Sequence, residues 1–119
     1  MPEQVSIRED LGLIHIDSYG EVSELDLIQS LEAAVKINKD RGLNRVFVNA
    51  TRQRLLPSTS SLAHFRLRLS EEAGTLKHAV VANPDLTEAL QFIEAGCRNC
   101  GMELQVFDSP EVALAWLNE

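Results

Sequence analysis

Long apolar runs are missing from this chain of 119 residues. The longest ones, such as Ala79–Ala82, extend over only a few residues, whereas a helix that crosses a bilayer needs ~20. The amino terminus, MPEQVSIRED, also lacks the basic segment and apolar block of a secretory signal. We therefore expect a cytoplasmic protein that does not insert into membranes.

Basic charge is scarce as well. The chain has 11 lysines and arginines against 18 aspartates and glutamates, which gives a net charge of −7. Nucleic acids and anionic membranes attract positive fields, so the sequence argues against both as general partners. Between Thr51 and Ser70, however, there is no acidic residue. We expect the arginines of this segment to form an anion-binding or docking surface: Arg52, Arg54, Arg66 and Arg68.

The sequence also lacks the glycine clusters that bind phosphates. Its six glycines are isolated, which argues against a P-loop or a dinucleotide-binding site. The three histidines have no zinc-like spacing. A pair formed by Ser60 and His64 lacks the Gly-x-Ser-x-Gly elbow of serine hydrolases. We therefore expect no catalytic activity, no cofactor and no metal.

Only two cysteines are present, and they form the motif Cys97-Arg98-Asn99-Cys100. A C-x-x-C motif is typical of redox pairs and of half zinc sites. Here it falls in the last turn of a predicted helix, where the partial negative charge disfavours a thiolate. Both cysteines also continue the apolar stripe of that helix. We therefore expect both to be buried, and thiol redox chemistry is the least favoured function.

The order of the remaining patterns predicts a single α/β domain over residues 1–119. We expect strands at 5–7, 11–16, 45–49, 78–82 and 104–107. We expect four helices, which begin near Ser23, Ser58, Asn83 and Ser109. The order β-β-α-β-α-β-α-β-α implies a five-stranded, mostly parallel sheet with an antiparallel N-terminal edge strand.

Helical spacing predicts which side chains face the core. The second helix carries its apolar stripe at Leu62, Phe65, Leu69 and Ala73. The third helix carries one at Leu86, Leu90, Ile93, Cys97 and Cys100. The fourth helix is expected to turn Val112, Ala113, Trp116 and Leu117 inward.

The segment NATRQRLLPSTSS, residues 49–61, connects the third strand to the second helix. We expect its first half to be a loop and Ser58 to cap the helix, with Thr59, Ser60 and Ser61 in the first turn. One interpretation is that these residues only start the helix. The other is that Ser58, Thr59, Ser60 and Ser61 form a phosphorylation or docking site, because a helix N-terminus favours anions and follows the carboxyl end of a strand.

The same segment resembles the central motif of STAS domains, the SpoIIAA-like anti-sigma-factor antagonists. Their motif reads Asp-Leu-Ser, a short loop, then Asp-Ser-Ser-Gly at the start of a helix. Asn49 and Thr51 match its first aspartate and serine, Pro57 matches the second aspartate, and Ser58 matches the phosphorylated serine. The ending, VFDSPEVALAWL at residues 106–117, resembles small stand-alone bacterial STAS/SEC14-like proteins.

This resemblance implies a SpoIIAA-like βα superhelix with no chemistry of its own. It implies a regulatory module that contacts a protein partner such as an anti-sigma-type kinase and that is switched by phosphorylation, with Ser58 as the first candidate. Its relation to SEC14 domains leaves a second function open, the binding of a small anion or a lipid-like ligand.

Overall fold

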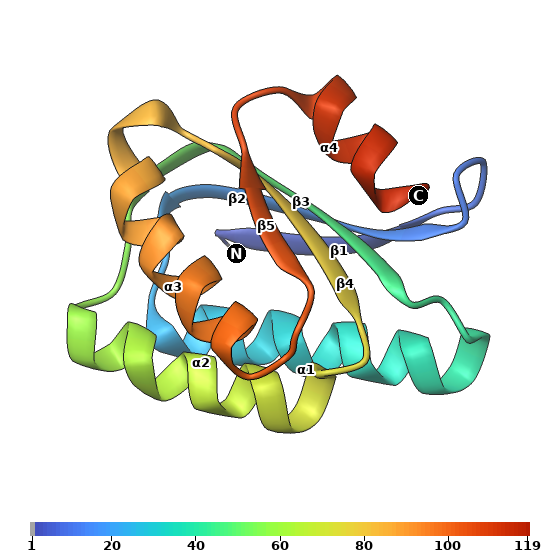
Figure 1. The fold of residues 1–119 in the computed structure, drawn as a ribbon, viewed down its shortest axis with the longest axis horizontal. Coiled ribbons are helices and arrows are strands. Elements are labelled where there is room, and N and C mark those ends of the chain that lie inside the picture. Colours follow the sequence, from blue (N-terminus) through green and yellow to red (C-terminus); the bar gives the residue numbers. More distant parts are fainter. Residues whose placement is uncertain (1) are drawn as a thin grey trace.

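A computed structural model describes residues 2–119, which form one five-stranded sheet with helices on both faces (Figure 1). The strands are β1 (Glu3–Arg8), β2 (Leu13–Glu21), β3 (Arg45–Leu55), β4 (Lys77–Ala82) and β5 (Leu104–Phe107). They lie side by side in chain order. β1 pairs antiparallel with β2, and all other pairs are parallel. The predicted sheet is thereby confirmed.

The helices are α1 (Glu24–Arg41), α2 (Thr59–Ala73), α3 (Thr87–Asn99) and α4 (Pro110–Leu117). A short 3-10 turn, η1 (Pro84–Leu86), precedes α3. α1, α2 and α3 cover one face of the sheet, and α4 covers the other (Figure 1). The larger part of the core lies on the three-helix side and contains the predicted stripe of α2 at Leu62, Phe65, Leu69 and Ala73.

The start of α1 is fixed by a capping box, as its sequence pattern indicates. The hydroxyl of Ser23 accepts a hydrogen bond from the backbone N–H of Asp26 at 3.2 Å, and the carboxylate of Asp26 accepts one from the N–H of Ser23 at 2.9 Å. At the other end, Gly42 adopts a φ of 71°, where a side chain would be strained. These two ends set the length of the helix.

The substitution Ser23→Ala should lower the free energy of unfolding by about 1 kcal/mol, because it leaves N–H groups at the helix start without a partner. Urea denaturation measures this. The matched control is Ser6→Ala on the exposed side of β1, which should change stability by less than about 0.5 kcal/mol. An equal effect of the two substitutions would contradict the capping role.

Several predicted details are wrong. β3 does not end at Asn49 but continues to Leu55, because β2 also extends and Tyr19 and Glu21 pair with Arg52 and Leu55. Residues 9–12, including Leu11, form the turn of the first hairpin. Val112 is 55% exposed rather than buried. α4 has only eight residues and packs mainly through Ala113 and Leu117, which lie one turn apart.

Within residues 2–119, no helix has both the length and the apolar character needed to cross a membrane.

Candidate functional site

The candidate site lies at the end of the sheet where α1 and α2 begin (Figure 1). The end of β2 leads directly into α1, and the N–H of Val22 donates to the carbonyl of Leu55 at the end of β3. Ser58, three residues after Leu55, is the N-cap of α2. Ser58, Thr59 and Ser60 are all exposed at this helix start. The segment is therefore available for contact with another molecule.

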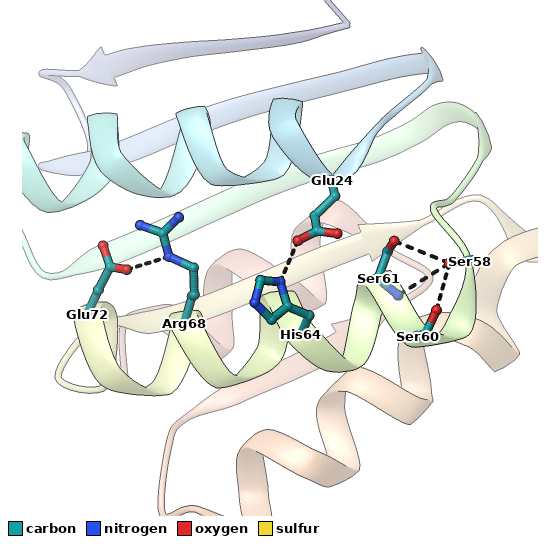
Figure 2. A network of polar contacts seen from close by, with 7 residues as sticks. All are labelled: Glu24, Ser58, Ser60, Ser61, His64, Arg68 and Glu72. Atoms are coloured by element: carbon teal, nitrogen blue, oxygen red, sulfur yellow. Dashed lines mark hydrogen bonds and ion pairs between the residues drawn. The ribbon is translucent and has the colours of Figure 1, made fainter.

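A cluster of hydroxyl groups forms the first turn of α2 (Figure 2). Ser58 caps the helix, and its hydroxyl accepts a hydrogen bond from the N–H of Ser61 at 3.3 Å. The same oxygen lies 3.2 Å from the hydroxyl oxygens of both Ser60 and Ser61. The first turn carries no acidic residue. The positive end of the helix dipole is therefore not neutralised by a carboxylate of its own helix.

A carboxylate of α1 contacts the second turn of α2. Nδ1 of His64 lies 2.6 Å from Oε2 of Glu24, which joins the first turn of α1 to the second turn of α2 (Figure 2). The hydrogen bond to His64 lowers the pKa of Glu24, and a contact with the hydroxyl of Ser61 lowers it further. Glu24 is therefore ionised at neutral pH, next to the hydroxyl cluster.

This pair supplies one element of a catalytic triad, a carboxylate that orients a histidine. In the part of the chain that the structure describes, however, the three serine hydroxyls bond with each other and none bonds with His64. The arrangement lacks an activated nucleophile. What the site offers is a set of exposed hydroxyls and free N–H groups on a fixed helix start.

The four arginines of the basic segment do not gather in one place. Arg52 and Arg54 lie on the extended end of β3, where both are exposed. The guanidinium of Arg52 lies over the ring of Tyr19, 5.6 Å from its centroid. Arg54 forms no ion pair with another described residue. These two side chains are the ones that precede the hydroxyl cluster along the chain.

Arg66 and Arg68 extend from α2 toward different helices. Arg68 bonds to Glu72 at 2.7 Å (Figure 2). It also lies 3.8 Å from Glu32 of α1. Arg66 crosses α3 at Gly96, where an added Cβ would come within 2.2 Å of the arginine side chain. Both guanidiniums thus connect neighbouring helices, and only Arg52 and Arg54 project from the strand that leads to the site.

The residues that match the STAS motif fall into two separate groups, because β3 extends beyond its predicted end at Asn49. The hydroxyl of Thr51 donates to the side-chain oxygen of Asn49 at 2.7 Å, so these two form a local pair on the strand. Pro57 and Ser58 come after the end of β3 at Leu55. The first half of the motif therefore lies on the strand and the second half on the helix start.

The two cysteines are not equivalent, and the prediction that both are buried is wrong for Cys100. Cys97 is fully buried, whereas Cys100 is exposed at the end of α3, and both are free thiols. The sequence places both on one stripe. The helix ends at Asn99, however, so Cys100 no longer follows the helical spacing.

Thiol labelling should therefore show two rates. Burial raises the pKa of Cys97 to about 11, so its thiolate is scarce as well as inaccessible. In the folded protein we expect one thiol per chain to react with Ellman's reagent and the second to react only after unfolding. Cys100→Ser should abolish the first reaction. Rapid native labelling of two thiols would contradict the buried position of Cys97.

Sequence reasoning missed a group of buried polar residues under the helices. Glu3 on β1, Ser18 on β2 and Gln53 on β3 are all less than 10% exposed. The signal was the alternation of the strands, because Glu3 shares its face with Val5 and Ser18 shares its face with Ile14 and Ile16. Gln53 was missed because the segment after Asn49 was predicted to be a loop rather than part of a strand.

Solved structures with a similar architecture are known. An uncharacterized protein of the DUF3478 family from Shewanella loihica PV-4, with a SpoIIAA-like fold, superposes with a TM-score of 0.65 at 20% identity. The match covers 97% of this chain and 93% of that one. This chain has the SpoIIAA-like fold.

Two structures of SpoIIAA itself superpose as well. The anti-sigma factor antagonist SpoIIAA in its unphosphorylated form gives a TM-score of 0.59 at 16% identity, with 98% of this chain and 97% of that chain covered. The Bacillus cell fate determinant SpoIIAA in its phosphorylated form gives 0.56 at 15%, with 97% and 98% covered. No family model matches the sequence, and the search of curated proteins also finds no match.

Proposed function

We propose that this chain is a non-enzymatic regulatory module that contacts a protein partner through the start of α2. The observation that carries the proposal is the exposed hydroxyl cluster at Ser58, Thr59 and Ser60, which sits on a helix N-terminus with no acidic residue in its first turn. The SpoIIAA-like fold supports it, because the similar SpoIIAA structures are of an anti-sigma factor antagonist.

Two exposed leucines lie close along the chain to the starts of α1 and α2. Leu55, at the end of β3, is 54% exposed, and Leu25, in the first turn of α1, is 62% exposed. Both belong to the segments that meet where Val22 bonds to Leu55. Large apolar side chains that remain in water favour burial against a partner. We define the docking surface as Leu25, Leu55, Ser58, Thr59 and Ser60.

Phosphorylation of Ser58 is the switch that the geometry favours. Its hydroxyl is exposed, and a phosphate there would meet the N–H groups and positive dipole of α2. Ser61 is less suitable because it is half-buried and contacts the ionised Glu24. Added charge on Ser58 would stabilise the helix start and, at the same time, repel an acidic partner. The SpoIIAA structures represent both a phosphorylated and an unphosphorylated form.

Photo-crosslinking in the cells that make the protein tests the docking surface. A photoreactive phenylalanine analogue is placed at Thr59, and the matched control carries it at Val112, which is also exposed but lies on α4, on the opposite face of the sheet. We expect a specific protein adduct from position 59 and none from position 112. No adduct at 59, or the same adducts at both positions, would contradict the proposal.

A further inference from the structure

A cavity of about 100 Å³ lies between the sheet and the three helices that cover it. Most of its lining is apolar and comes from both layers, with Ile16 and Val80 on the sheet and Leu31, Phe65 and Ile93 on the helices. Protein cores are close-packed, so an opening of this size is unusual in a domain of 119 residues. The cavity is separate from the docking surface, because none of the docking residues lines it.

One end of the cavity is polar. Glu3, Ser18, Ser30 and Gln53 line it there, and they come from three strands and one helix. Glu3 is 7% exposed, and its Oε2 accepts a hydrogen bond from the hydroxyl of Ser18. Its second oxygen, Oε1, has no partner among residues 2–119. The hydroxyl of Ser30 is also close enough to Glu3 to lower its pKa. Oε1 nevertheless lacks a hydrogen bond of normal geometry, and a buried carboxylate oxygen without a donor costs stability.

The ionisable groups at this end are acidic. Burial raises the pKa of Glu3, the hydrogen bonds with Ser18 and Ser30 oppose that shift, and the nearby carboxylate of Asp26 adds to it. No lysine or arginine lines the cavity, and its one histidine is His78 on β4. In the sheet, His78 pairs with Val46, and Val46 pairs with Ile14. Ile14 lies four residues before Ser18 on β2. A positive donor group next to Oε1 would remove the repulsion between the two acids and complete the hydrogen bonding of Glu3.

Size limits the rest of the ligand. A cavity of roughly 150 Å³ holds a benzene molecule, and this one is smaller. It is therefore too small for a long acyl chain, which argues against the lipid-like ligand that the SEC14 relation leaves open. We propose that the cavity binds a small primary alkylamine, whose ammonium group donates a hydrogen bond to Oε1 of Glu3 while its short chain contacts the apolar lining.

Three probes with chains of equal length test the head group: n-butylamine, n-butanol and butyrate. Each is titrated into the full chain at pH 7 and constant ionic strength, and binding is followed through the methyl chemical shifts of the cavity residues. We expect saturable shifts with butylamine, at least tenfold weaker binding of butanol, and no binding of butyrate. Butyrate binding as tightly as butylamine, or no saturable shift with any probe, would overturn the proposal.

Substitutions of residues that line the cavity test whether Glu3 contacts the amine. Glu3→Gln keeps the shape of the side chain and should weaken butylamine binding at least tenfold, with butanol affected less than twofold. Glu88→Gln, at an exposed site on α3, is the matched control and should change nothing. Ala34→Leu, which fills the cavity from α1, should abolish binding of every probe. If either Glu3→Gln or Ala34→Leu bound butylamine as tightly as the wild type, the proposed site would be ruled out.

Discussion

At pH 4.5 the protein should be less stable than at pH 7 by roughly 2 kcal/mol through His78 alone. This histidine is 6% exposed, and burial lowers its pKa from 6.5 to about 4, against a lesser opposing contribution from a hydrogen bond with the backbone of Leu76. Its Nδ1 has no partner within the described residues. The folded state therefore holds the ring neutral in a place where the charged form is unfavourable.

The sign follows from proton uptake. Between pH 6.5 and about pH 4 the unfolded chain binds a proton at His78 that the folded chain does not bind, so the free energy of unfolding falls as the pH falls. Glu3 acts in the opposite direction, because its pKa is raised and its protonation favours the folded state. Glu24 and Glu111, whose pKa values are lowered from 4.5, contribute stability that begins to be lost as the pH falls through 4.5, so their loss adds to that of His78.

Urea denaturation at several pH values, on the wild type and on His78→Leu, isolates this residue. The variant replaces the ring by an apolar group of similar size and should be at least as stable as the wild type at pH 7. Its stability should fall less between pH 7 and pH 4.5, and the difference between the two proteins should grow by roughly 2 kcal/mol. Parallel curves for the two proteins would contradict the neutral, buried histidine.

The substitution Phe65→Ala should lower the free energy of unfolding by about 4 kcal/mol. Phe65 is 8% exposed and holds α2 against the sheet, and its ring lines the existing cavity. Truncation therefore removes apolar contacts and enlarges an opening that the surrounding residues already leave unfilled. The cost should therefore lie within the usual range for buried aromatic residues.

Thermal or urea unfolding measures this loss. The matched control is Leu67→Ala on the same helix, where the side chain is 51% exposed and the change should be below about 0.5 kcal/mol. Because Phe65 anchors the helix that carries Ser58, its loss should also increase hydrogen exchange at the start of α2. A loss below 1 kcal/mol would show that α2 is held by other contacts.

The fold was predictable because its signals are local. Ser23 and Asp26 form a capping box that depends on four consecutive residues, and Gly42 supplies the left-handed conformation that ends α1. The apolar stripe of α2 follows helical spacing without interruption. Buried strands such as β4 form continuous apolar runs between turn signals. Each of these features can be recognised without knowledge of the rest of the chain.

The extension of β3 and the buried polar group depend on distant partners instead. Residues after Asn49 are polar and resemble a loop, and only their pairing with the end of β2 makes them a strand. The sequence predicts that Arg66 binds an anion, but in the structure its side chain packs across α3 at Gly96, which has no Cβ to block it. The helix start at Ser58 was predictable because its cap is local, but the hydrogen bond between Glu24 and His64 joins residues 40 positions apart.

The most direct test of the regulatory role is the intact mass of the protein purified, under several growth conditions, from the cells that make it. We expect one added phosphoryl group in at least one condition, located at Ser58. It should disappear in Ser58→Asn, which retains a side chain able to cap the helix, and persist in Ser60→Ala. An unmodified mass under every condition, or a phosphoryl group that persists in Ser58→Asn, would contradict the account.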